Sequence, residues 1–109
     1  MQSYQSGRFK INGKSYTQPL ALSHQQILDF KLPNNANELT IENLQQIGFK
    51  GYEVVILGTG GTLTFPDWDL LEQAQCLGRS LEIMATDAAC RTFTALADEG
   101  RKVLAILYP

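Results

Sequence analysis

Tyr52-Glu53-Val54-Val55-Ile56-Leu57-Gly58-Thr59-Gly60-Gly61 is an apolar, β-branched run that leads directly into a cluster of glycines. Such a run predicts a strand that is covered on both faces, as in a parallel sheet. A helical pattern begins a few residues later, at Pro66-Asp67. Strand, glycine loop and helix occur in this order in many nucleotide and phosphate sites, because a helix N-terminus presents unpaired N–H groups to an anion. This stretch therefore indicates the fold class and marks a candidate site.

The rest of the C-terminal half alternates in the same way. Buried strands are predicted over residues 52–57 and 103–107 and a short strand over residues 80–84, with helices from Pro66 to Gly78 and from Thr86 to Gly100. Thr86 is expected to cap its helix, with Asp87 in the first turn. Strands that alternate with helices predict an α/β fold with a central, largely parallel sheet and helices packed on it.

The N-terminal third has the pattern of β structure. Asn12-Gly13 favours a type I′ turn, and it separates two short runs at residues 8–11 and 14–17. Two further short strands are predicted over residues 20–22 and 26–30. Residues 38–46 fit either a short helical turn that ends at Gly48 or a strand followed by a turn. We favour the helical turn, because glycine suits the position after a helix.

The composition excludes several classes of protein. The chain has 109 residues, which predicts one domain over residues 1–109, and its net charge of −2 gives no reason to expect nucleic-acid binding. No apolar run approaches the roughly 18 residues that a membrane-spanning helix needs, and the N-terminus lacks the features of a signal peptide. Cys76 and Cys90 match no zinc spacing and are predicted to be reduced and mostly buried. A cytoplasmic location is therefore expected.

The glycine loop completes none of the well-defined nucleotide or catalytic motifs. Gly58 and Gly60 fit a dinucleotide fingerprint, but Leu63 takes the place of its third glycine. A phosphate loop would need a lysine after the glycines, and the Gly-x-Ser-x-Gly sequence of a nucleophile elbow does not occur. Two interpretations remain. The glycines either permit a sharp turn, or their N–H groups line an anion site to which Thr59 and Thr62 add hydroxyls.

Other polar residues have simpler interpretations. His24 is the only histidine and is predicted to be a solvated turn residue, so no metal site is expected. Asp67 and Asp69 suit the positive end of a helix dipole. Arg91 is a solvated residue by default, but it could lean towards the glycine loop. Trp68 either packs at the edge of the core or anchors a partner, since aromatic residues are common at interface hot spots.

Three blocks of the sequence, residues 53–60, 81–93 and 99–107, together resemble the Mth-domain family of small proteins. The resemblance implies a three-layer α/β domain around a mixed sheet, with a β-rich N-terminal part and no established catalytic activity. It also implies that the Gly58–Gly60 turn, residues 88–91 and Gly100-Arg101 lie close together as a functional surface. Thr94 departs from the asparagine that the family often carries there, and a hydroxyl replaces only some hydrogen bonds of an amide.

The sequence therefore predicts a non-enzymatic cytoplasmic protein that acts through another protein, as an interaction or assembly and accessory factor. The alternative is a small-molecule or anion-binding domain that uses the glycine loop with a nearby arginine. No cofactor, nucleic acid or membrane insertion is predicted. The candidate ligand or partner surface comprises Gly58, Thr59, Gly60, Gly61, Arg91 and Arg101.

Overall fold

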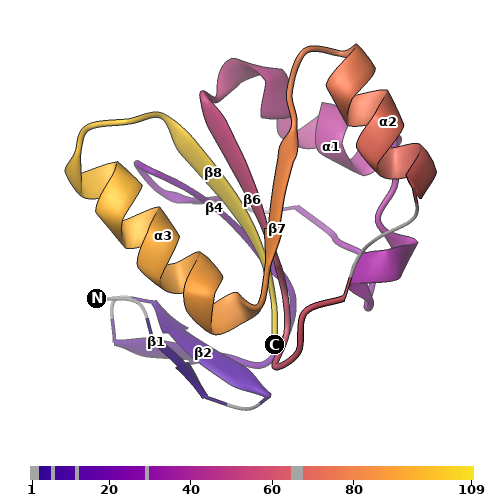
Figure 1. Cartoon of the computed structure of the whole chain (residues 1–109). Coiled ribbons are helices and arrows are strands. Elements are labelled where there is room, and N and C mark those ends of the chain that lie inside the picture. Colours follow the sequence, from indigo (N-terminus) through magenta and orange to yellow (C-terminus); the bar gives the residue numbers. More distant parts are fainter. Residues whose placement is uncertain (1–2, 6, 12, 29, 65–67) are drawn as a thin grey trace.

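A central five-stranded mixed sheet organises the protein (Figure 1). The computed structural model describes residues 3–5, 7–11, 13–28, 30–64 and 68–109. The sheet has the strand order β5-β4-β8-β6-β7. Its members are β4 (Leu20–Ser23), β5 (Ile27–Leu28), β6 (Val54–Thr59), β7 (Leu81–Met84) and β8 (Val103–Tyr108). Strands β7, β6 and β8 run parallel, whereas β4 is antiparallel to both β8 and β5. The predicted α/β class and mixed sheet are confirmed.

The N-terminal segment forms a separate antiparallel sheet of β1 (Ser3–Gln5), β2 (Arg8–Ile11) and β3 (Lys14–Tyr16). The predicted hairpin is confirmed, because β2 and β3 pair around the turn and Gly13 has a φ of 83°. The other turn residue, Asn12, lies outside the described residues. The side chains of Phe9 and Ile11 are buried and pack on the same side of the main sheet as α3 (Thr86–Asp98). This small sheet therefore extends the cover of one face.

Two helices cover the opposite face. They are α1 (Ile41–Ile47) and α2 (Trp68–Cys76), accompanied by the 3₁₀ turns η1 (Ala36–Glu38) and η2 (Phe49–Gly51). Helix α1 begins with a capping box in which Thr40 and Asn43 exchange hydrogen bonds, and it is followed by Gly48 with a φ of 79°. The predicted helical turn that ends at Gly48 is confirmed. The predicted start of α2 at Pro66-Asp67 lies outside the described residues.

The strand order explains why helices cover both faces. From β6 the chain passes through α2 to β7 on one side, and from β7 it returns through α3 to β8 on the other side of β6. Parallel crossovers are almost always right-handed. Two crossovers of the same hand that run in opposite directions must use opposite faces, and Figure 1 shows α2 and α3 on opposite faces of the sheet.

Each central strand contributes to two hydrophobic cores. Leu104 and Ile106 of β8 belong to the core beneath α1 and α2, whereas Val103, Ala105 and Leu107 belong to the core beneath α3. All residues of β8 are buried, as expected when successive side chains point to opposite faces of a covered sheet.

The end of β6 differs from the prediction. The strand continues through Gly58 to Thr59, two residues beyond the expected end at Leu57. A Cβ at Gly58 would lie 3.0 Å from Thr86 Oγ1 and 3.1 Å from the Ala89 Cβ and Leu107 Cδ2. Gly58 is therefore a buried strand residue whose missing side chain lets α3 pack closely on β6.

The two cysteines occupy different environments. Cys90 lies on the buried face of α3, but Cys76 is exposed, so the prediction that both thiols are mostly buried is wrong for Cys76. The helical period explains the difference, because position 76 lies about 200° around α2 from the buried Ala74. Burial, with a smaller contribution from the negative charge of Asp87, raises the pKa of the Cys90 thiol to about 11.

We expect Gly58→Ala to lower the free energy of unfolding by about 1–3 kcal/mol, because the new methyl group meets three close neighbours in a packed layer. Gly51→Ala is the matched control, since a Cβ there has no neighbour within 4 Å and the residue has no positive φ. The control should stay within about 1 kcal/mol of the original chain. Urea denaturation measures both, and equal effects would contradict the packing role of Gly58.

The cysteines should differ in reactivity towards iodoacetamide at pH 8. A thiol with a pKa of about 11 is roughly 0.1% thiolate at that pH, so Cys90 should react slowly in the folded protein while Cys76 reacts readily. Because burial favours the neutral thiol, alkylation of Cys90 should accelerate only as the pH rises towards 11 or the chain unfolds. Peptide mass spectrometry reads out each site, and comparable rates in the folded protein would contradict this assignment.

Candidate functional site

The glycine loop is tied to the start of α3. The Gly60 N–H donates a hydrogen bond to Thr86 Oγ1 (2.8 Å), and the Thr86 N–H donates to the Gly60 carbonyl (2.9 Å). Thr86 Oγ1 in turn donates to the carbonyl of Tyr108 at the end of β8 (2.6 Å). Gly60 has a φ of 100°, and a Cβ there would lie 3.0 Å from the Pro109 carbonyl oxygen. The loop, the helix and the last strand are thereby joined through one buried hydroxyl.

This arrangement corrects the predicted role of Thr86. The N-cap position belongs to Ala85, which makes no side-chain cap, and Thr86 is the first residue of the helix. Thr86 is fully buried, so its hydroxyl bonds to the loop and to β8 rather than to the helix's own N–H groups. The sequence places a threonine near the helix start, but only the folded chain shows which backbone groups surround it.

The loop hydroxyl of Thr59 is also engaged within the loop. It donates to the Thr62 carbonyl (2.8 Å) and accepts from the Thr64 N–H (3.1 Å). Gly61 and Thr62 are exposed. Two of the donors expected to face an anion, the Gly60 N–H and the Thr59 hydroxyl, therefore hold the loop in shape.

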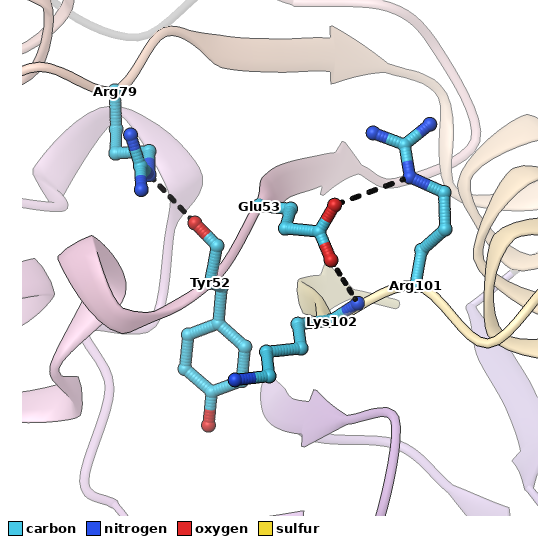
Figure 2. Close-up of polar contacts among 5 residues, drawn as sticks. All are labelled: Tyr52, Glu53, Arg79, Arg101 and Lys102. Carbon is cyan, nitrogen blue, oxygen red and sulfur yellow. Dashed lines mark hydrogen bonds and ion pairs between the residues drawn. The ribbon is translucent and has the colours of Figure 1, made fainter.

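The structure places Arg101 at the other end of the sheet. Its Nε lies 3.6 Å from Glu53 Oε2, and Glu53 Oε1 accepts from the Lys102 N–H at 3.2 Å (Figure 2). Strand register pairs Val54 with Val103 and Thr59 with Tyr108, so about 17 Å of strand separates this ion pair from the glycine loop. The expectation that Gly100-Arg101 and the glycine turn lie together is wrong, because parallel strands keep their starts and ends at opposite edges.

Arg91 forms an ion pair on its own helix. Its guanidinium pairs with Asp87 one turn earlier on α3 at 3.6 Å, and its side chain is 72% exposed. A surface pair of this spacing contributes little to stability because solvent screens it. Of the six predicted surface residues, the structure brings together Gly58, Thr59, Gly60 and Gly61, and it separates Arg101 from them.

A hollow of about 350 Å³ opens beside Thr59 at the carboxyl ends of β6 and β8. Open α/β sheets commonly bind ligands at this edge. The residues that line it are all uncharged side chains: Thr17, Gln18, Pro19, Asn34, Asn35, Ala36, Thr59, Tyr108 and Pro109. Burial raises the pKa of the Tyr108 hydroxyl well above its usual value, which keeps it neutral. The hollow therefore suits a neutral molecule better than an anion.

The most exposed large apolar side chain among the described residues is Trp68, at 75%. It lines a trough of about 270 Å³ between α2 and β7. Leu71 and Gln75 line the α2 side, and Ser80, Leu81 and Ile83 line the β7 side. The sequence left open whether Trp68 packs or binds, and it gave no sign of the strand residues opposite. One signal for this surface is present in the sequence: Trp68 and Leu71 are three residues apart on α2 and are not among its buried residues, Leu70 and Ala74.

His24 differs from the solvated residue that the sequence predicts. Its ring is partly buried and meets Tyr52 edge-on, with centroids 6.1 Å apart. The Nδ1 atom is buried and has no hydrogen-bond partner among the described residues. A hollow of about 200 Å³ lies beside it, next to Phe93 and Thr94. The Thr94 hydroxyl, which stands where the family often has asparagine, donates to the Cys90 carbonyl (2.9 Å).

The described part of the chain lacks two kinds of feature. It contains no group of three or more histidine, cysteine, aspartate and glutamate side chains placed to hold a metal ion. None of its helices has the length and apolar character required to cross a membrane.

We expect Thr86→Val to lower the free energy of unfolding by about 2–4 kcal/mol, because it leaves a buried N–H and a buried carbonyl without their hydroxyl partner. Thr86→Ser is the control: it keeps the hydroxyl and loses one methyl group, at a cost of about 1 kcal/mol. Urea denaturation gives the difference, and amide exchange of Gly60 should accelerate only in the valine variant. Equal destabilisation by both variants would show that the methyl group, rather than the hydroxyl, is responsible.

Comparison with known proteins extends over almost the whole chain. Residues 1–108 match the family described as protein of unknown function (DUF498/DUF598). A "13 kDa major membrane protein" from Francisella tularensis is 31% identical over 107 residues, which cover 97% of this chain and 87% of that protein. The NADH dehydrogenase [ubiquinone] 1 alpha subcomplex assembly factor 3 from Danio rerio is 30% identical over 109 residues. That alignment covers 98% of this chain and 62% of the assembly factor.

Solved structures give the same result. The NMR structure of XCC1710 from Xanthomonas campestris superposes with a TM-score of 0.83 at 26% identity, and covers 96% of this chain and 81% of that one. A Mth938-like domain from Bordetella pertussis has a TM-score of 0.76 at 21% identity, with coverage of 98% and 83%, and shares the fold. The chain belongs to the DUF498/DUF598 family, the Mth-domain family that its three sequence blocks resemble.

Proposed function

We propose that this protein acts by binding another protein, as an assembly or accessory factor, and that the surface around Trp68 makes the contact. The observation that carries the proposal is the 75% exposure of this side chain beside an apolar trough. Relatives that carry the name of an assembly factor support the class of function.

The chemistry of the trough fits protein binding. Trp68 presents a large apolar ring with one N–H donor, and tryptophan is enriched at residues that dominate binding energy. Half-buried Leu71, Leu81 and Ile83 surround the hollow, so a partner would remove further apolar surface from water. Polar Gln75 and Ser80 complete the lining and supply groups that can orient a bound chain.

The anion-binding alternative has weaker support. It needs free N–H and hydroxyl donors together with a cation, but the Gly60 N–H and the Thr59 hydroxyl are bonded within the protein. Arg101 pairs with Glu53 at the opposite end of β6. The glycine loop is therefore better explained as the joint that fixes α3, and the Trp68 surface is the stronger functional candidate.

The test is affinity capture by the tagged full-length chain from extracts of cells that produce it, with quantitative mass spectrometry. Trp68→Ala should reduce capture of at least one protein about tenfold or more, as expected for a hot-spot residue. Ile27→Ala is the matched control, because Ile27 is also an exposed apolar residue but lies on β5 at the far edge of the sheet. Capture that is absent, or that both variants reduce equally, would contradict the proposal.

A further inference from the structure

Strand β7 lies at an open edge of the main sheet. It pairs with β6 on one side, and in the part of the chain that the structure describes no strand pairs with its other side. The outer backbone N–H and C=O groups of an edge strand can pair with another extended chain. The opposite edge strand, β5, has only two residues and offers a much shorter template.

Helix α2 and β7 together form a recess along this edge. Trp68, Leu71 and Gln75 recur at intervals of three and four residues, so they share one face of α2. Leu81 and Ile83 alternate along β7 and turn towards the same trough. Figure 1 shows α2 beside β7, on the face of the sheet opposite α3. Side chains alternate along a strand, so a strand added to β7 would direct every second side chain to the face that carries α2 and the trough.

The charged side chains on α2 and β7 are all negative. Helix α2 carries Asp69 and Glu72, β7 carries Glu82, and neither element contains lysine or arginine. Glu82 is exposed and lies between Leu81 and Ile83 in sequence, so it faces the side of the sheet away from the trough. The nearby Arg79 is held by its Nε–H, which donates to the Tyr52 carbonyl at 2.6 Å (Figure 2).

We propose that β7 accepts an extended segment of a partner protein in which apolar and basic residues alternate. This inference rests on the proposed function and specifies its mode of binding. Backbone pairing with β7 supplies the affinity that strand addition provides in general. The apolar side chains of the partner segment enter the trough beside Trp68. Its basic side chains lie on the other face of the added strand and meet Glu82.

Two other occupants fit the edge less well. Pairing of β7 with β7 of a second copy places two Glu82 carboxylates on neighbouring strands, and like charges across a strand pair are destabilising. A helix seated in the trough contacts Trp68 but leaves the edge backbone groups of β7 without partners. An extended segment of alternating apolar and basic residues fills the trough, pairs with the edge backbone groups of β7 and brings positive charge to Glu82.

The experiment selects phage-displayed random 12-residue peptides on the immobilised full chain. Enriched peptides should alternate apolar and basic residues, and synthetic copies should protect the amides of residues 81–84 from hydrogen exchange. N-methylation of the peptide backbone on its pairing edge should weaken binding at least tenfold. Trp68→Ala should do the same, and Glu82→Lys should shift selection from basic to acidic peptides.

Ile27→Ala and Glu42→Lys are the matched controls and should leave peptide affinity unchanged, because they alter an exposed apolar and an acidic residue outside α2 and β7. Peptides with helical spacing, protection confined to amides outside β7, or unaltered binding after N-methylation would overturn strand addition. Two further results would also overturn the proposal. One is that no selected peptide requires Trp68 for binding, and the other is that the chain forms a dimer which Trp68→Ala dissociates. If the peptides have helical spacing, protect amides outside β7 or tolerate N-methylation, Trp68-dependent capture of a protein would still support the proposed function of protein binding.

Discussion

The pairing of β6 with β8 is the constraint on which the rest of the architecture depends. Both strands are apolar along almost their whole length and lie inside the sheet, so each must be covered on two faces. The chain meets this requirement by placing β7 beyond β6 and then returning to β8. The handedness of the two crossovers puts α2 and α3 on opposite faces. The N-terminal hairpin and α1 cover the remaining area.

The packing of α3 on β6 and β8 explains the role of the glycine cluster. Gly58 permits α3 to approach β6, and Gly60 turns the chain so that its N–H and C=O both meet Thr86. The carbonyl of Tyr108 completes the junction. In nucleotide-binding folds the corresponding loop directs its donors at a phosphate. Here the Gly60 N–H bonds to the first residue of the protein's own helix and the Thr59 hydroxyl bonds within the loop, so a similar local sequence supports the architecture instead.

Much of the fold could be predicted because it depends on local patterns. The apolar runs of β6 and β8, the Asn-Gly hairpin turn and the glycine that ends α1 each carry their signal within a few residues. The contacts that could not be predicted join distant parts of the chain. Arg101 meets Glu53 across 48 positions, and the hydroxyl of Thr86 reaches both Gly60 and Tyr108. The exposure of Trp68 depends on which face of α2 the core takes, and the trough depends on β7 being an edge.

The central place of β8 has a consequence for how the protein acquires its structure. Residues 20–23 pair with residues 104–107, so β4 and β6 remain without their shared neighbour until the last described strand is available. During synthesis from the N-terminus, the residues of β4 and β6 are therefore made before β8, the strand that pairs with both of them. Long-range pairing of this kind slows folding and prolongs the exposure of apolar surface. Until β8 pairs with both strands, the apolar surfaces of β4 and β6 remain open to unwanted contacts.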